Sequence, residues 1–222
     1  MLIVSGGFAI YRRDIVVELG GFSSEFTCED IELTFRVHEY MRKNKRQYKV
    51  LSLPEAVSWT EAPYTWKDLY SQRHRWQRVI AETCWKYKNM LFNPRYGSVG
   101  LIGMPYYIFG EALAWAPEVV ALVIIPLAIF LGVFAWEPLV IFLGIYVLAN
   151  VLVSVLAIHL HDVGFRSLSL KEMGRMILLS FIESFGYRQL LSYARLAGTI
   201  GFLRGDKGWK KSNRVERKDL GD

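Results

Sequence analysis

Two long apolar runs constrain the fold of this 222-residue chain more than any other feature. Residues 119–136 and 138–158 form runs of 18 and 21 residues without a formal charge. A helix that crosses a bilayer needs about 20 largely apolar residues, so each run predicts a membrane span, with a tight turn at 136–138. The alternative is a pair of buried helices in a soluble core, but such helices normally carry a polar stripe, and these runs have none.

The charged residues lie outside these runs and divide the chain into three parts. The sequence has 27 Lys+Arg and 21 Asp+Glu, for a net charge of +6, with 52% hydrophobic and 22% charged residues. This composition excludes a disordered chain, and two cysteines are too few for a disulfide scaffold. Most charges precede residue 96 or follow residue 203. We therefore predict a soluble domain at 1–95, a membrane region at 96–203 and a basic tail at 204–222.

The membrane region contains two further stretches of less regular character. Residues 96–110 are uncharged, rich in glycine and interrupted by Pro105, and residues 173–203 are amphipathic with Glu183, Arg188 and Arg195 among the charges inside them. We predict interfacial or re-entrant helices for both, because charges at membrane depth are costly. Basic residues at 166–175 and in the tail favour a cytoplasmic location for these parts and for the soluble domain.

This topology predicts an integral membrane protein in contact with membrane lipid, in a plasma membrane of bacterial type. Two spans place every basic segment on the cytoplasmic side, whereas a third full span would place the tail outside. The alternative interpretation of the tail is a solvated chain end near anionic lipid, without a specific role. No nucleic acid is expected as a partner, because no basic stripe with stacking aromatic residues is present.

The first 95 residues predict a mixed α/β segment. A helix over residues 14–19 should end at Gly20-Gly21, and two capping boxes, at 27–30 and 65–68, should begin longer helices, the second reaching about residue 87. The run 31–37 alternates with period two and also fits a strand, although its cap favours helix. Short apolar runs predict strands at 2–4, 50–53 and 56–59.

Glu29 and Asp30 are the first candidates for chemistry, as adjacent carboxylates at a predicted helix N-terminus. The helix dipole stabilises a negative charge there, which suits a carboxylate that accepts a proton from a substrate hydroxyl. The alternative is that Asp30 only completes the helix cap.

A second group of candidates lies in the run Gln72-Arg73-His74-Arg75-Trp76. Gln72, Arg75 and Trp76 stand at i, i+3 and i+4 and would share one helix face. Arginine binds phosphate oxygens in a bidentate manner, and an indole ring offers a flat surface for a sugar. This face, with the neighbouring Arg73, predicts binding of a phosphorylated sugar. The alternative is a solvated basic helix with a buried tryptophan.

These segments together resemble the membrane-integrated family 2 glycosyltransferases, which include the synthases of cellulose, chitin, hyaluronan and poly-N-acetylglucosamine. The resemblance covers about residues 1–100. It rests on Ser5-Gly6-Gly7-Phe8, Tyr11-Arg12-Arg13, Gly20-Gly21-Phe22, Glu29-Asp30-x-x-Leu33-Thr34-x-Arg36, Pro54-Glu55-Ala56, Trp59-Thr60-Glu61, Pro63 and Gln72-x-x-Arg75-Trp76, a QxxRW motif. The tail segment Gly205-Asp206-Lys207-Gly208-Trp209 and the membrane region also look like this family, less specifically.

The resemblance implies a cytoplasmic GT-A domain, here its C-terminal part, that transfers sugar with inversion from a UDP-sugar to a β-linked polysaccharide or a lipid-linked acceptor. Asp30 would match the general base. Gln72, Arg75 and Trp76 would match the motif that holds the acceptor end and the donor diphosphate, and Gly6 and Gly7 would lie beside the acceptor. The implied cofactor is Mg²⁺ or Mn²⁺, which neutralises the leaving diphosphate. An accessory subunit is a further implied partner.

The sequence departs from the family pattern in three places. Cys28 stands where the family has threonine, and the glycine that often follows the last motif is replaced around Arg78-Val79. No Asp-x-Asp motif occurs in the 222 residues. We therefore expect the chain to be the C-terminal half of the enzyme, with the metal ligands and the UDP pocket upstream, and inactive alone. The alternatives are a catalytically incomplete membrane scaffold or export partner of a polysaccharide synthase, and an enzyme that adds one sugar to a lipid.

Overall fold

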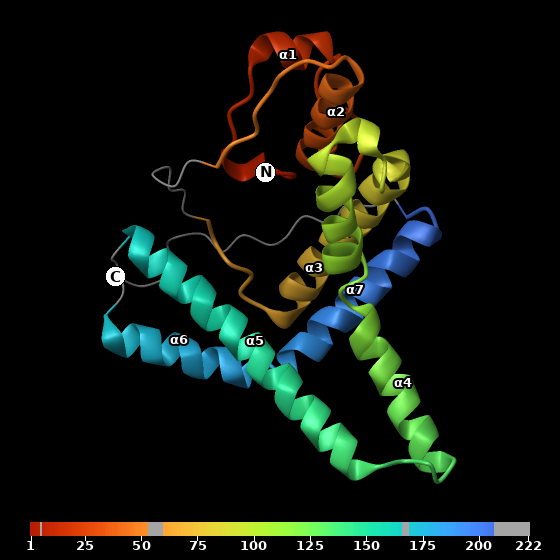
Figure 1. Cartoon of the computed structure of the whole chain (residues 1–222), viewed down its shortest axis with the longest axis vertical. Coiled ribbons are helices and arrows are strands. Elements are labelled where there is room, and N and C mark those ends of the chain that lie inside the picture. Colours follow the sequence, from red (N-terminus) through yellow and green to blue (C-terminus); the bar gives the residue numbers. More distant parts are fainter. Residues whose placement is uncertain (5, 53–59, 166–168, 207–222) are drawn as a thin grey trace. The chain divides into compact units, whose positions relative to one another are not determined.

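The computed structural model describes residues 1–4, 6–52, 60–165 and 169–206, and Figure 1 shows their arrangement. It contains two compact units, which are Met1–Trp115 with the described residues from Ala194 onward, and Ala116–Tyr193. Residues 96–115 therefore pack with the first unit, so the compact units differ from the domains predicted by sequence. Which residues lie in a bilayer stays a prediction.

The regular elements among the described residues are all helices, and these residues contain no β-strand, so the predicted strands at 2–4 and 50–52 are wrong. A strand needs a neighbouring strand to complete its hydrogen-bond ladder. Here the carbonyl of Leu2 faces the His38 ring, and the N-terminal amine donates to the carbonyl of Val50. The predicted strand at 56–59 lies outside the described residues, and a GT-A assignment stays a prediction.

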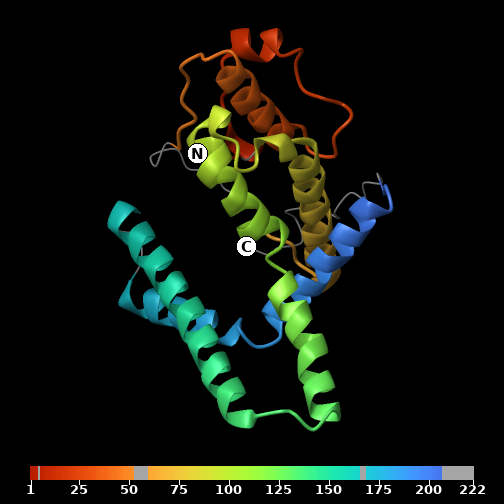
Figure 2. The ribbon, with the colours of Figure 1, turned by 45° about the vertical axis from the view of Figure 1, so that its right-hand side comes forward.

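The first unit is built on three α-helices, α1 (Arg13–Glu18), α2 (Glu29–Lys43) and α3 (Trp66–Lys86). Short 3-10 turns and two π-helical segments complete it; these are η1 (Gly6–Phe8), η2 (Lys88–Met90), η3 (Pro94–Tyr96), η4 (Val99–Gly103) and η5 (Tyr106–Ala112). Figure 2 shows the segment η4–η5 beside α3. The core between these elements consists of Phe35, Cys84, Tyr87, Met90, Tyr96, Met104, Tyr107 and Ala112.

The two predicted helix caps differ in outcome. At α3 the Thr65 hydroxyl accepts a hydrogen bond from the Asp68 amide at 3.1 Å, which confirms Thr65 as the helix cap. The Asp68 carboxylate accepts from the Thr65 hydroxyl at 2.6 Å. At α2 the cap position is Cys28, without a side-chain cap, so the predicted Thr27 cap is wrong. The Thr27 amide instead donates to Glu82 on α3 at 3.5 Å, a contact between distant segments that local spacing does not reveal.

A buried carboxylate joins α1, α2 and α3. Glu32 is fully buried and pairs with Arg36 at 2.9 Å and Lys86 at 3.2 Å, and it accepts a hydrogen bond from the Tyr87 hydroxyl at 2.7 Å. Arg36 also donates to the carbonyls of Leu19 and Gly21, at the end of α1. The network therefore holds the Gly20–Gly21 turn, where both glycines have φ +82°, against α2.

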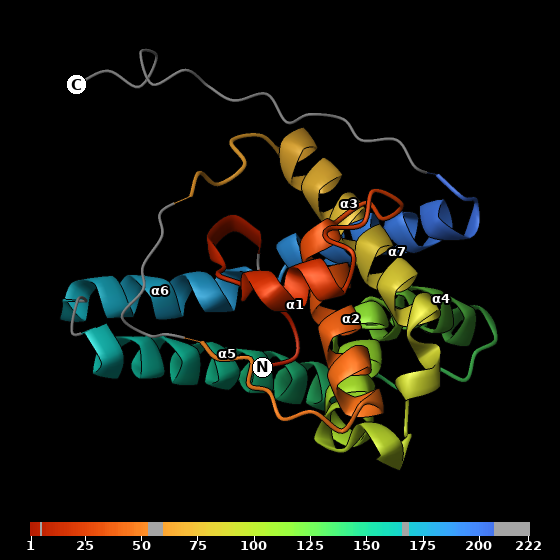
Figure 3. The same cartoon turned by 90° about the horizontal axis from the view of Figure 1, so that it is seen from above.

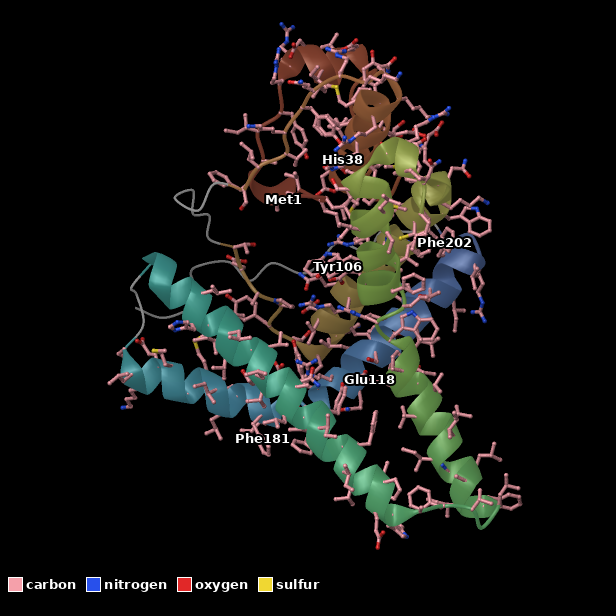
Figure 4. All side chains as sticks on the ribbon, in the orientation of Figure 1. Met1, His38, Tyr106, Glu118, Phe181 and Phe202 are labelled. Carbon is pink, nitrogen blue, oxygen red and sulfur yellow. The ribbon has the colours of Figure 1, made fainter. Side chains whose placement is uncertain are left out.

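His38 is a second buried polar group and ties the N-terminal residues to α2 (Figure 4). Its Nε2 lies 3.1 Å from the carbonyl of Leu2, which can only accept, so Nε2–H donates and Nδ1 accepts from the Tyr48 hydroxyl at 2.6 Å. Burial lowers the pKa of His38 from 6.5 to about 4. The imidazole is therefore neutral in the folded chain at neutral pH.

We expect the fold to lose stability in mild acid because of His38. The unfolded chain takes up a proton near pH 6.5 and the folded chain only near pH 4, so stability is full above pH 6.5 and falls as the pH drops toward 4. The linkage gives a loss of about 2 kcal/mol at about pH 5. Thermal unfolding in detergent at neutral and acidic pH checks this. His38→Gln should flatten the dependence, and an equal acid loss in that variant would contradict the assignment.

The last helix, α7 (Tyr187–Leu203), packs tightly against α3 within the first unit through Gly198. A Cβ at Gly198 would lie 2.4 Å from the carbonyl oxygen of His74 and 2.9 Å from Cβ of Gln77. Gln77 is buried and its amide nitrogen donates to the carbonyl of Ala112 and to the Thr199 hydroxyl. The contact thus needs glycine on α7, and on α3 the Gln77 amide nitrogen is satisfied by two acceptors.

Gly198→Ala should destabilise the first unit by about 1–3 kcal/mol, since the overpacked atoms are backbone and cannot rotate away. Gly174→Ala on α6 is the matched control, because a Cβ there meets nothing within 4 Å. Alanine in that open helical position should be neutral or slightly stabilising. Melting temperatures of the two purified variants provide the test, and equal values would contradict close packing at Gly198.

The second unit contains α4 (Ala116–Phe130), α5 (Trp136–Phe165), α6 (Leu170–Ile182) and the start of α7. Figure 3 shows α5 and α6 side by side. The α4–α5 turn lies at residues 131–135, so the predicted turn at 136–138 is wrong. Pro138 instead stands in the first turn of α5, where its missing amide costs no helical hydrogen bond.

One helix in the described residues, α5, is long and apolar enough to cross a membrane, over Trp136–Leu160 with a mean hydropathy of 2.6. A second candidate is the pair Val99–Ala112 and Ala116–Phe130, which qualifies only when counted as one broken span. The predicted span at 119–136 is therefore not one continuous helix, since α4 ends at Phe130.

The amphipathic stretch predicted at 173–203 is a pair of helices, α6 and α7, as expected. Its internal charges have partners, because Arg188 pairs with Glu183 at 2.7 Å and Arg195 lies 4.0 Å from Glu111. Within the second unit, Glu118 of α4 accepts hydrogen bonds from the hydroxyls of Tyr146 and Ser192 (Figure 4).

Candidate functional site

Asp30 occupies the second position of α2 and is held by backbone amides. Its Oδ2 accepts from the amide of Gly6 at 2.6 Å, and its Oδ1 accepts from the amide of Ile31 at 2.8 Å. A Cβ at Gly6 would lie 2.6 Å from Oδ2 and 2.8 Å from Cβ of Asp30, so only glycine allows this approach. The structure therefore brings together Asp30 and Gly6, which the sequence selected separately.

The other candidates near Asp30 are more exposed. Glu29 is exposed at the first position of α2, and Gly7 is exposed beside Gly6 in η1. The N-terminus of α2 carries a partial positive charge, which attracts negatively charged groups in its first turn. Of the two adjacent carboxylates, Asp30 is the one held by a hydrogen bond from the glycine segment, Gly6–Gly7.

The four candidates of the QxxRW region lie on α3, and the predicted helix is confirmed. Gln72, Arg73 and Arg75 are half-buried, whereas Trp76 is 42% exposed. The guanidinium of Arg73 stacks over the Trp76 ring, 4.5 Å from its centroid. One face of the indole is therefore covered by Arg73, a contact that the sequence analysis did not anticipate.

The pKa of the Cys28 thiol depends on the charges at the start of α2. The pKa of Cys28 is raised to about 11, mainly by burial and also by the negative charge of Asp30, while the positive charge of Arg75 opposes the rise. Asp30 and Arg75 therefore both lie within electrostatic reach of this thiol. The acidic and basic motifs, 45 residues apart in sequence, therefore lie in the same region of the first unit.

Two side chains at this place were missed by sequence analysis. Glu82 on α3 binds the Thr27 amide, and Tyr107 of η5 lies within electrostatic reach of Asp30 and Cys28. Tyr107 is 2% exposed and packs against Phe35, with ring centroids 5.4 Å apart. Neither belongs to a local motif, and the apolar context of Tyr107 gave no polar signal.

The arrangement combines three chemical capabilities. A fixed carboxylate can accept a proton, a nearby guanidinium can bind an anion, and a partly exposed indole can contact an apolar sugar face. No group of three or more His, Cys, Asp or Glu in the described ranges could hold a metal ion. The described residues therefore do not fit a Mg²⁺ or Mn²⁺ site by themselves.

Comparisons with known proteins agree with this chemistry. A family model described as glycosyl transferase family group 2 matches residues 1–163. A 71-residue segment, 32% of this chain, is 41% identical to the probable glycosyltransferase YdaM of Bacillus subtilis. A 73-residue segment, 33% of the chain, is 30% identical to the poly-beta-1,6-N-acetyl-D-glucosamine synthase of Staphylococcus aureus.

These matches span 15% and 16% of the two relatives, so the chain covers only a small part of their length. No solved structure gives a significant match. The family model nevertheless covers well over half of the chain, and it confirms the resemblance drawn from the glycine, acidic and QxxRW segments. On this evidence the chain belongs to glycosyl transferase family group 2.

Proposed function

We propose that this chain provides the acceptor side of an inverting sugar transfer, with Asp30 as the general base. The observation that carries the proposal is the Asp30 carboxylate, fixed by the Gly6 amide at 2.6 Å at the start of a helix. A carboxylate held in this way stays oriented toward one position and needs no reorganisation when it accepts a proton.

The proposed step is a single displacement at the anomeric carbon of a UDP-sugar. The acceptor hydroxyl oxygen forms the new C–O bond while the bond to the diphosphate breaks, so the configuration inverts. The hydroxyl proton moves to the Asp30 carboxylate, and UDP leaves with the electron pair. Glu29, exposed beside Asp30, adds negative charge and is the second candidate for proton transfer.

Substrate binding is assigned to α3 and the glycine segment. Arg75 would pair with the donor diphosphate, while Gln72 and the open face of Trp76 would contact the acceptor sugar. Arg73, stacked on the other face, would hold the indole in place. Gly6 and Gly7 would lie beside the acceptor. A β-linked polysaccharide is the proposed acceptor, because one relative is named as such a synthase.

The divalent cation that family 2 enzymes use is not assigned to any described residue, and no step above depends on it. When bound, Mg²⁺ or Mn²⁺ would neutralise the leaving diphosphate. We further propose that α5 crosses the membrane and that the catalytic part faces the cytoplasm. The apolar length of α5 and the basic residues outside the apolar runs support this orientation.

The test is sugar incorporation by membranes that carry this chain together with a donor-binding domain of the same family, because the chain alone is expected to lack the UDP pocket. Radiolabelled UDP-N-acetylglucosamine and UDP-glucose are supplied in turn, and both UDP release and labelled product are measured against membranes without the protein. We expect a product whose new linkage has the β configuration by NMR. An α linkage would contradict inversion, and no turnover with any nucleotide sugar would favour a scaffold role.

A further inference from the structure

A basic pocket lies at the other end of α2, away from Asp30. It has a volume of about 740 Å³ and lies in the first unit, between the α2 C-terminus, the segment after it and η3. Asp30 and Arg42 are 12 residues apart on one helix, which is about 18 Å along its axis. The pocket is therefore separate from the candidate catalytic site.

Five of the side chains that line the pocket are cationic and none is acidic. The cations are Arg42, Lys45, Arg46, Lys49 and Arg95. Arg46 is partly neutralised by Glu18 at 2.7 Å, an exposed pair. Within the described ranges, Lys45, Lys49 and Arg95 have no ion-pair partner. Such an excess of one charge raises the local concentration of anions.

Arg42 is held in position by its surroundings. Its guanidinium lies 5.6 Å from the centroid of the Tyr48 ring, and a Cβ at Gly97 would approach its Nη1 to 3.2 Å. Tyr48 is itself anchored, because its hydroxyl donates to the His38 ring. Nε of Arg42 is buried and has no hydrogen-bond partner in the part of the chain that is described. A guanidinium held in position in this way is suited to a phosphate or other oxyanion.

The backbone conformation at Lys45 places another cation at this pocket. Lys45 adopts φ +53°, a left-handed conformation that is costly for a residue with a Cβ. The turn directs the chain from α2 into the segment that carries Tyr48 and Lys49. Strained backbone of this kind is often found at binding sites.

We propose that this pocket binds a ligand that carries a diphosphate or comparable phosphate charge, at a site distinct from the sugar-transfer centre. A freely diffusing phosphate compound and the headgroup of an anionic phospholipid share this chemistry. The guanidinium of Arg42 contributes the fixed bidentate donor, and Lys45, Lys49 and Arg95 supply mobile charge around it. The volume accommodates more than one phosphate group.

The first experiment is a calorimetric titration of the full chain in detergent with inorganic diphosphate. The double variant Lys45→Gln/Lys49→Gln removes two pocket charges, and Lys67→Gln/Lys88→Gln removes two exposed charges elsewhere. We expect the pocket variant to lose about tenfold or more in affinity and the control to change less than about twofold. Asp30→Asn should bind diphosphate as the wild type does.

The second experiment identifies the source of the phosphate. Phosphatidylglycerol or phosphatidylcholine is added to the detergent-solubilised chain, and bound lipid is counted by native mass spectrometry. Retention of phosphatidylglycerol that depends on Lys45 and Lys49 would assign a lipid headgroup, and diphosphate binding alone would assign a soluble ligand. Absence of both, or equal losses in the pocket and control variants, would overturn the proposal.

Discussion

Asp30→Asn should reduce sugar transfer by about 10²–10⁴-fold, the range typical of the loss of a general base. Asparagine keeps the size of the side chain, and its oxygen can still accept from the Gly6 amide, so the fold should be unchanged. The acceptor hydroxyl, however, loses the group that takes its proton. The rate of labelled-sugar incorporation at saturating donor and acceptor is the measurement.

Two companion variants make the result specific to Asp30. Glu25→Gln removes an exposed carboxylate from the segment before α2 and should leave the rate within about twofold, in line with the small effects of exposed charges. Glu29→Gln should cost less than Asp30→Asn, because Glu29 lacks the contact with the glycine segment. A full rate in Asp30→Asn, or a larger loss in Glu29→Gln, would remove Asp30 from the role of base.

Glu32→Ala should destabilise the first unit by about 3–5 kcal/mol, the usual cost of removing one partner from a buried ion pair. The substitution leaves Arg36 and Lys86 without their shared carboxylate and the Tyr87 hydroxyl without its acceptor. It should also loosen the glycine turn after α1, since Arg36 holds that turn. Thermal unfolding of the detergent-solubilised chain is the measurement.

Glu39→Ala on the same helix is the matched control. Glu39 and Lys43 form an ion pair with the same four-residue spacing as Glu32 and Arg36, but their side chains are 29% and 52% exposed. Exposed pairs contribute less than about 1 kcal/mol. Comparable melting temperatures for Glu32→Ala and Glu39→Ala would show that burial of Glu32 does not determine the stability of the unit.

The features that the sequence predicted well depend on neighbours within one helical turn. The Thr65–Asp68 cap and the extent of α3 follow from side-chain-to-backbone bonds over three residues. The period-two alternation over 31–37 did not distinguish a helix from a strand. The structure explains this ambiguity, because the polar residue Glu32 lies on the buried face of the helix, where it has partners at the C-terminal end of α3. No local pattern encodes those partners, which lie 54 and 55 residues away.

The candidate site was predictable as residue types but not as geometry. Local pattern selected Asp30 and Arg75, and the family resemblance selected Gly6. How these residues lie relative to one another depends on how α2 and α3 pack and on the contact between Gly6 and Asp30. The predicted strand at 2–4 is wrong because three consecutive apolar residues indicate that a segment is buried, but they do not indicate which groups its backbone binds by hydrogen bonds. The turn after α4 was misplaced because Pro138, read as a turn residue, is equally suited to the first turn of a helix.

The backbone contact at Gly198 has a mechanical consequence for α3. Side chains that separate two helices can change their conformations, which allows one helix to slide or roll over the other. At Gly198 no side chain separates the two helices, and the carbonyl of His74 lies close to the backbone of α7. Any rotation of α7 is therefore transmitted to the turn of α3 that carries Arg75 and Trp76. The orientation of the indole and the guanidinium therefore depends on the packing of this part of α7 against α3, and not on α3 alone.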